Sequence, residues 1–269
     1  ACLGRLKFRV RELEPSAFAF MVEGMGGTGK STIMEVDQRF WPFHLVGIMS
    51  SNMQSQFGMA ELIDKEVIHC DETAKNLKAP QEEWQTAISG GIGSYAVKHK
   101  EPRVAACKAN FFMIGNKGID DTYDNSCGQV TRRTMGILFP NVVRPRDTQI
   151  ESKLRCQLGV ILRKQILAYF EFAREIGTVD PLSLPHKLPP AFYFYYCRSR
   201  RKTDPVEDFI EEGTYVQTKK DAWMRMDHFK ELYNQYRVKY EIPMAGRKPW
   251  GEDVWKGAFS ERGITYQKM

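Results

Sequence analysis

The chain has 269 residues, with 39 basic and 33 acidic side chains and a formal net charge of +6. Hydrophobic residues make up 42% and charged residues 27%, which is ordinary globular usage and excludes a disordered or fibrous chain. The mild basic excess permits binding to nucleic acid without establishing it. Since no apolar run approaches the roughly 20 residues that a membrane-spanning helix needs, we expect no membrane partner.

The six cysteines lie far apart and form no C-x-x-C pair. This spacing favours the reduced thiols of an intracellular protein over a disulfide framework or a zinc site. The sequence begins without methionine and in mid-pattern, so we expect it to be part of a longer chain.

Short apolar runs that stop at glycine or polar residues predict five strands in the first half of the chain. They cover residues 18–23, 45–49, 66–70, 110–115 and 135–139. Residues 33–40 predict a helix that ends at Trp41-Pro42, because proline disfavours helix in the residue before it. Strands separated by helices indicate an α/β fold of three layers, in which helices cover both faces of a mostly parallel sheet.

The second half of the chain has helical patterns. Apolar residues at three- and four-residue steps from 150 to about 175 predict one long amphipathic helix. Prolines and glycines at 177–190 predict a linker, so we divide the chain into a large domain, 1–177, and a small, mostly helical domain, 178–269.

Three helices are predicted within the small domain. Asp204-Pro205 fits an N-cap followed by proline in the first turn of a helix. An aromatic stripe from Trp223 to Tyr240 predicts a second helix, and residues 253–261 predict a last, short one.

Residues 24–31, with the sequence GMGGTGKS, match the complete phosphate-binding pattern G-x-x-x-x-G-K-[ST]. Glycines let backbone N–H groups face phosphate oxygens, and the following helix presents its positive N-terminus to them. Lys30 supplies a charge to the β- and γ-phosphates, and the Ser31 hydroxyl is a ligand for Mg²⁺. We therefore predict a site for ATP and Mg²⁺. The predicted contacts are Gly24, Gly26, Gly27, Thr28, Gly29, Lys30, Ser31 and Thr32.

A second acidic site follows the third predicted strand, which ends in Asp71-Glu72. The carboxyl ends of parallel strands converge where ligands bind. We predict that Asp71 holds Mg²⁺ and that Glu72 orients and deprotonates the attacking water. The alternative is a solvated acidic turn at the end of a strand. His69, inside this strand, is expected to be a core or interface residue.

Two further polar sites complete the candidate catalytic set. Asn116 closes the next strand, where its amide is suited to the γ-phosphate or the attacking water, although Asn-Lys-Gly alone is a turn signal. Arg132-Arg133 precedes the last strand. Arginine stabilises charge on a transferred phosphoryl group, and in ring-forming hydrolases a neighbouring subunit offers it. The alternative is a surface pair at the start of a strand.

Residues 90–102 predict a projecting hairpin. Glycines lead into a short alternating strand, which ends in the basic run Lys98-His99-Lys100 and a proline. Such cations suit the phosphates of a nucleic-acid strand, whereas a solvated turn is the alternative.

The order of these elements resembles the ATPase core of superfamily 3 helicases, the AAA+-related motors of small and large DNA viruses. Motif A of that family corresponds to Gly24–Ser31. Motif B corresponds to the strand ending at Asp71-Glu72, and motif C to the strand ending at Asn116.

Two more motifs follow the same order. The glycine-and-lysine motif of this superfamily corresponds to Gly90–Lys100, and the arginine finger to Arg132-Arg133. Counted back from Phe139-Pro140-Asn141, Arg133 fits the finger better than Arg132. The sequence SNMQSQFG at 51–58 and the aromatic C-terminal third resemble more specifically the primase-helicases of nucleocytoplasmic large DNA viruses, of the poxvirus type.

This resemblance implies a homo-hexameric ring that hydrolyses ATP at subunit interfaces and moves along single-stranded or forked DNA during viral replication. It implies that Lys98, His99 and Lys100 line the central channel. It also implies a fused or associated primase, a winged-helix-like module in 178–269, and action in the host-cell cytoplasm or at a viral replication site. Only 23 residues precede Gly24, fewer than the helical oligomerisation segment that usually precedes motif A.

Two other functions stay open at this point. A P-loop nucleoside or nucleotide kinase would explain residues 24–31 and an acidic residue, but it needs neither Asn116 nor the basic hairpin. A nucleotide-gated DNA-binding scaffold with weak ATPase activity is the third alternative. The intact Lys30, the acidic pair and the arginines argue against it.

Overall fold

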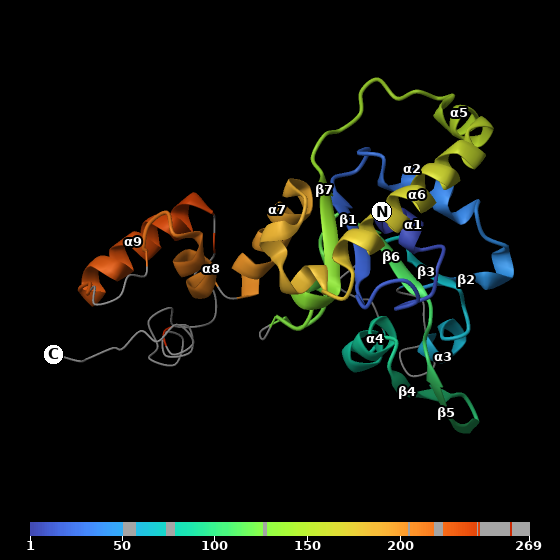
Figure 1. The fold of residues 1–269 in the computed structure, drawn as a ribbon, viewed down its shortest axis with the longest axis horizontal. Coiled ribbons are helices and arrows are strands. Elements are labelled where there is room, and N and C mark those ends of the chain that lie inside the picture. Colours follow the sequence, from blue (N-terminus) through green and yellow to red (C-terminus); the bar gives the residue numbers. More distant parts are fainter. Residues whose placement is uncertain are drawn as a thin grey trace. The chain divides into compact units, whose positions relative to one another are not determined.

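The five predicted strands pair in a single parallel sheet in the computed structural model of the chain (Figure 1). The structure describes residues 1–50, 58–73, 79–125, 128–203, 205–217, 223–240, 242 and 259. The order across the sheet is β2-β3-β6-β1-β7. The strands are β1 (Ala19–Gly24), β2 (Val46–Ile48), β3 (Val67–Cys70), β6 (Asn110–Gly115) and β7 (Thr134–Phe139). All five predicted strands are therefore confirmed.

Burial explains why these segments are almost continuously apolar. In β3 and β6 every residue is buried, as are the first five residues of β1. A parallel sheet with helices on both faces has no solvent-facing side, so both faces of each strand carry core residues. β1 lies between β6 and β7, with Gly24 opposite Phe139.

Helices cover the sheet on both faces, as the three-layer prediction requires. On one face, Met59 of α3 and Trp84 of α4 join a core with Phe111 of β6. On the other face, Met34 of α2 joins a core with Phe112 of β6 and with Leu6, which follows the N-terminal helix. The helices of this part are α1 (Cys2–Arg5), α2 (Lys30–Gln38), α3 (Gly58–Leu62), α4 (Gln81–Ile88), α5 (Ile150–Cys156) and α6 (Leu158–Ile176).

The prediction of one long helix over 150–175 is wrong in one respect. The structure contains two helices, because Gln157 leaves helical geometry with φ −109° and ψ 5° between α5 and α6. The spacing of apolar residues does not reveal a break of one residue, because the three- and four-residue steps continue from α5 into α6. Of this predicted stripe only Tyr169 is fully buried, and Ile150 is 42% exposed.

The chain divides into two compact units, and the main boundary falls after Tyr196. The first unit comprises 1–125 and 129–196, and the second comprises 126–128 and the chain from Cys197. Residues 181–196 stay with the first unit because Leu182, Leu188 and Tyr195 pack into its cores. The segment that we predicted as a linker at 177–190 therefore contains core residues.

The second unit has its own aromatic core. The boundary between the units falls within helix α7 (Pro190–Thr203). Helices α8 (Pro205–Glu212) and α9 (Met226–Lys239) follow it in the chain. Phe209 of α8 packs against Phe229, Tyr233 and Tyr236 of α9. The predicted aromatic helix is thus confirmed, although Trp223 lies before it and is 84% exposed. The short helix predicted at 253–261 lies outside the described residues except at Phe259.

None of the helices in the described part of the chain combines the length and the apolar character that crossing a membrane would require.

A buried ionic cluster fastens the N-terminal segment to the sheet. Nε of Arg5 donates to Oε1 of Glu14 at 2.7 Å, and both side chains are almost completely buried. The same guanidinium donates to the carbonyl oxygens of Ser16 and Phe18 and to the amide of Asn110 in β6. Each buried charge is therefore paired and hydrogen-bonded, which is the condition under which its burial is tolerated.

Glu14→Ala should lower the free energy of unfolding by about 3–5 kcal/mol, because it leaves the buried guanidinium of Arg5 without its carboxylate. Urea-induced unfolding measures the change. Arg9→Ala is the matched control, since Arg9 and Glu66 form an exposed pair at 3.1 Å that contributes about 0–1 kcal/mol. Equal losses in the two variants would contradict the structural role of the Arg5 cluster.

Candidate nucleotide-binding site

The loop between β1 and α2 has the backbone geometry of a phosphate-binding loop. Gly27 and Gly29 adopt the left-handed region, with φ of 81° and 93°, which side chains with a Cβ rarely adopt. A Cβ added at Gly26 or Gly29 would meet no heavy atom within 4 Å, so the loop opens onto free space. Successive N–H groups in such a turn form a concave site for anions.

Lys30 is held inside this loop by three acceptors. Its Nζ donates to the carbonyl oxygens of Gly24 at 2.6 Å and Met25 at 2.8 Å, and to Oδ1 of Asn116 at 3.3 Å. Burial lowers the pKa of Lys30, because desolvation disfavours its charged form. The structure thus brings Asn116, from the end of β6, to the lysine of the loop.

The acidic pair lies at the same edge of the sheet. Asp71 and Glu72 follow β3 directly, and both are exposed. Thr73 fixes their position, since its N–H donates to Ile114 O at 3.0 Å and its hydroxyl donates to Lys117 O at 2.6 Å. These bonds fasten the end of β3 to the end of β6. The carboxylates therefore lie beside the strand end that carries Asn116.

The donors at this edge suit Mg²⁺. Ser31, in the first turn of α2, is exposed, as are the two carboxylates. Magnesium prefers hard oxygen ligands and uses one or two carboxylates together with phosphate oxygens and water. Such a set needs no cluster of three acidic, histidine or cysteine side chains, and the described residues contain none. Burial raises the pKa of the neighbouring Cys70 to about 12.

His69 is a core residue, as we expected. Its side chain is fully buried, with Nε2 3.0 Å from Oδ2 of Asp37 and its ring edge-on to Phe112. Asp37 belongs to α2 and also pairs with Lys7. This contact joins the helix that follows the phosphate-binding loop to the strand that carries Asp71.

The two candidate arginines lie at the other end of the sheet. They end a short helical turn, Thr131–Arg133, immediately before β7. β7 runs parallel to β1 with Thr134 opposite Ala19, so the arginines and the loop are separated by about five strand residues, roughly 17 Å. The structure therefore does not bring them to the phosphate-binding loop of their own protomer.

The two arginines also differ from each other. Arg132 is exposed. Arg133 is half-buried, and it donates to Gln129 O at 2.9 Å and to the hydroxyl of Ser89 at 3.4 Å. Burial and the like charge of Arg132 lower the pKa of Arg133.

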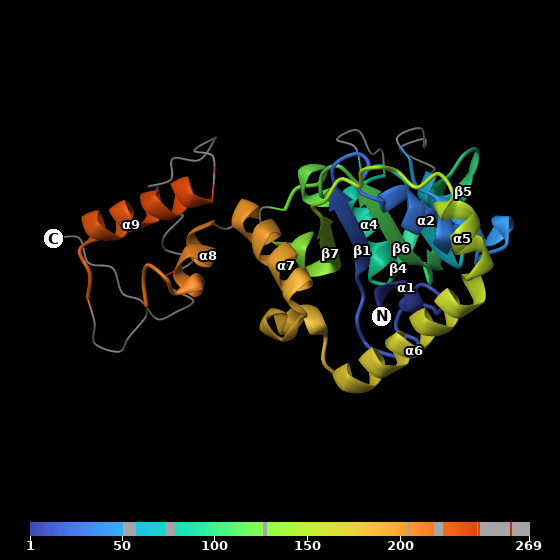
Figure 2. The same cartoon turned by 90° about the horizontal axis from the view of Figure 1, so that it is seen from above.

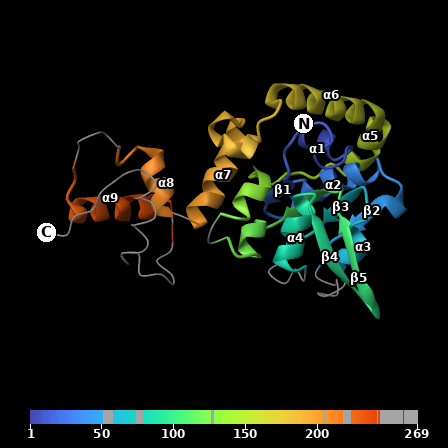
Figure 3. The same ribbon diagram turned by 60° about the horizontal axis from the view of Figure 1, so that its bottom comes forward.

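The predicted hairpin is present and projects from the sheet (Figures 1 and 3). β4 (Ile92–Val97) and β5 (Lys100–Ala106) pair antiparallel, and Val97 faces Lys100 across a two-residue turn. His99 has φ 58° in that turn. Lys98, His99 and Lys100 are all exposed, so the tip of the hairpin presents the basic residues to solvent.

A polar segment that carries none of the predicted motifs, residues 140–149, also contacts the phosphate-binding loop. Residues 140–149 form the β7–α5 connection, which passes the carboxyl end of β1 in Figure 2. The N–H of Val143 donates to Gly27 O at 3.0 Å. A Cβ added at Gly27 would lie 3.3 Å from Nη2 of Arg146 and 3.5 Å from Val142. No sequence motif marks this contact, because it depends on how the connection folds back.

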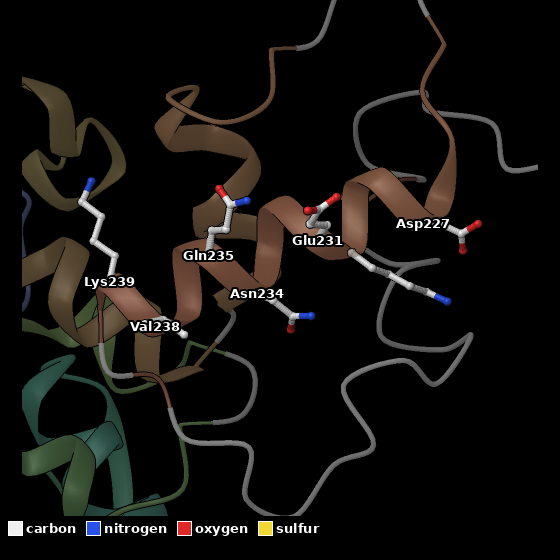
Figure 4. A pocket seen from close by; sticks show the side chains of 7 residues that line it. Asp227, Glu231, Asn234, Gln235, Val238 and Lys239 are labelled. Atoms are coloured by element: carbon white, nitrogen blue, oxygen red, sulfur yellow. The ribbon is translucent and has the colours of Figure 1, made fainter.

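The second unit has a surface depression of a different kind. It runs along α9 (Figure 4) and is lined by Asp227, Lys230, Glu231, Asn234, Gln235, Val238 and Lys239. Its lining mixes acidic, basic and amide side chains. Unlike the candidate nucleotide-binding site, this lining includes neither a glycine turn nor the end of a strand.

One family model matches part of the chain. A model described as a family of unknown function, DUF5906, matches residues 22–133. These residues extend from β1 to the arginine pair and so contain every site residue that the sequence predicts. No curated protein matches the chain.

Solved structures show a distant likeness. The A form of the apo C-terminal region of NrS-1 is 16% identical with a TM-score of 0.45, covering 95% of this chain and 65% of that one. A second apo structure of that region is 16% identical with a TM-score of 0.46, covering 93% and 62%. A ligand-bound JCV helicase is 13% identical with a TM-score of 0.35, covering 86% and 58%. The chain thus spans less than two thirds of each of them.

Proposed function

We propose that this chain is the ATP-hydrolysing core of a DNA helicase of the superfamily 3, AAA+-related type. One observation carries the proposal: Lys30 of the phosphate-binding loop hydrogen-bonds Asn116 at the end of β6, which lies beside the end of β3 with its two carboxylates. A nucleotide-binding loop alone would suit many proteins. The three strand ends together provide what hydrolysis of a triphosphate requires.

Each group then has a role in cleavage of the γ-phosphate. Backbone N–H groups of residues 26–31 and the ammonium of Lys30 bind the phosphates. Ser31 and Asp71 would hold Mg²⁺, and Glu72 would take a proton from the attacking water. Asn116 orients that water or the γ-phosphate. Mg²⁺, when bound, neutralises charge that develops on the phosphate oxygens.

The arginines act on the site of a neighbouring protomer. A guanidinium that stabilises the transferred phosphoryl group must contact it, and Arg132-Arg133 lies at the opposite end of the strands from the loop of the same protomer. Protomers packed head to tail would place this end against the next nucleotide site. Such packing forms a closed ring where the rotation between protomers closes, and we propose that this ring is a homo-hexamer.

The basic hairpin is the proposed DNA contact. It lies in the chain between the acidic pair and Asn116, and its second strand leads into Asn110 at the start of β6, the strand that carries Asn116 at its other end. Exposed cations at its tip suit the backbone of single-stranded or forked DNA. Movement of the hairpin with the state of the nucleotide would couple hydrolysis to translocation.

The narrower assignment rests on sequence alone. Residues 51–58 and the aromatic last third favour the primase-helicases of nucleocytoplasmic large DNA viruses, although 51–57 lie outside the described residues. On this assignment the partner is a fused or associated primase, residues 178–269 form an accessory module, and the site of action is the host-cell cytoplasm or a viral replication site.

The first prediction separates the three candidate functions. ATP hydrolysis by the protein should rise when single-stranded DNA is added, and Lys30→Ala should lower turnover by about a hundredfold or more, because it removes a charge from the transition state. Release of inorganic phosphate measures both effects. Transfer of phosphate to a nucleoside would favour the kinase, and negligible turnover with DNA present would favour the scaffold.

The second prediction concerns the arginines. Arg133→Ala should bind ATP normally but turn over about a thousandfold more slowly, the usual effect of a missing arginine finger. Arg132→Ala is the matched control and should change turnover less. Mixing Arg133→Ala with Lys30→Ala protomers should restore part of the activity, since some interfaces then combine an intact loop with an intact finger. If neither arginine variant loses turnover, the pair is not the finger.

The third prediction concerns the hairpin. Lys98→Ala should weaken binding to a fluorescently labelled single strand by about threefold or more at low salt, while hydrolysis without DNA stays near the wild-type rate. Lys108→Ala removes the same charge from an exposed position beyond the end of β5 and should have little effect. A Lys98→Ala variant that binds and unwinds DNA like the wild type would remove the hairpin from the proposal.

A further inference from the structure

The β7–α5 connection, residues 140–149, is held against the phosphate-binding loop at several points. It leaves β7 at Phe139, which lies opposite Gly24 across the sheet. Four residues after Phe139, Val143 donates its N–H to Gly27 O at 3.0 Å. Val142 and Arg146 also lie within van der Waals distance of a Cβ built on Gly27. The connection therefore contacts the phosphate-binding loop at Gly27.

Its far end is fixed as well. Oδ1 of Asp147 accepts from the N–H of Gln149 at 2.9 Å, and its Oδ2 accepts from Lys153 at 2.6 Å, so this carboxylate closes the turn that leads into α5. α5 in turn is joined to the end of α2 by an ion pair between Glu151 and Arg39. α2 begins at the phosphate-binding loop. One end of the connection therefore contacts this loop, and the other end is joined through α5 to the helix that follows the loop.

The position of Arg146 follows from these two attachments. Its Nη2 lies beside Gly27, while its side chain is exposed and so is accessible to a ligand. Lys30 is engaged by carbonyl oxygens at the inner side of the loop. A triphosphate carries several negative charges, and a guanidinium can give two parallel hydrogen bonds to phosphate oxygens.

We propose that Arg146, beside Gly27, is a phosphate-contacting residue of the nucleotide site in its own protomer. The proposal rests on the proposed nucleotide site at residues 24–31 and adds to it a residue that lies beyond every recognised motif. It assigns Arg146 a role in cis, whereas the Arg132-Arg133 pair is too far from this loop to share that role.

Binding of a fluorescent ATP analogue and of adenosine to the whole chain tests this assignment. Arg146→Ala should weaken binding of the ATP analogue by about tenfold, the usual effect of losing a charge-assisted hydrogen bond, and should leave adenosine binding unchanged. Arg146→Lys should recover part of the loss because it keeps the charge. Arg144→Ala is the matched control, since Arg144 is an exposed arginine of the same connection and should alter binding by less than about twofold.

Other outcomes overturn the assignment or its basis, and they are distinguishable. If Arg146→Ala binds the ATP analogue as tightly as the wild type, Arg146 makes no phosphate contact. If Arg144→Ala and Arg146→Ala lose equal affinity, the connection contributes only a diffuse positive field. If the wild-type chain does not bind the analogue and Lys30→Ala changes nothing, the proposed nucleotide site fails and the role of Arg146 fails with it.

Discussion

The hydrogen bond between Lys30 and Asn116 depends on one constraint, the parallel pairing of β1 with β6 and of β6 with β3. Parallel strands end at the same edge, so residues that follow them meet although they are far apart in sequence. The register aligns Cys70 with Met113 and Glu23 with Gly115. A shift of one residue between β1 and β6 would move Asn116 away from the loop, and a shift between β6 and β3 would move the acidic pair away from Asn116.

Buried polar contacts between α2 and β3 stabilise this arrangement. Asp37 of α2 accepts from Lys7 and pairs with His69 of β3, and neither Asp37 nor His69 has measurable exposure. Desolvating these groups costs free energy that apolar residues would not incur. In return, the contacts fix α2 relative to β3, and so fix Lys30 relative to Asp71. The chemistry at the edge of the sheet therefore depends on groups that never touch a ligand.

The sequence predicted those features that arise from local pattern, and it missed those that arise from tertiary packing. Five apolar runs and one glycine motif were sufficient for the sheet and for the loop around Lys30, because each has a local physical cause. No local sequence pattern predicts the break at Gln157 or the burial of Tyr195 against Gly136 of β7. The proximity of Arg146 to Gly27 likewise comes from the path of the β7–α5 connection. Positions that long-range contacts create leave no periodicity to detect.

Under the proposed function, the same parallel pairing that completes one part of the site leaves another part incomplete. It gathers the loop, Asn116 and the carboxylates at one end of the strands, and it places Arg132-Arg133 at the other end. No side-chain movement spans roughly five strand residues, so under this proposal Arg132-Arg133 would act on the nucleotide site of a second protomer. Hydrolysis is then a property of the assembly, and its rate follows the population of protomers in contact. The buried Arg5 cluster holds the start of β6, and the Asp37 cluster holds β3 against α2, so both contribute to the position of the strand ends.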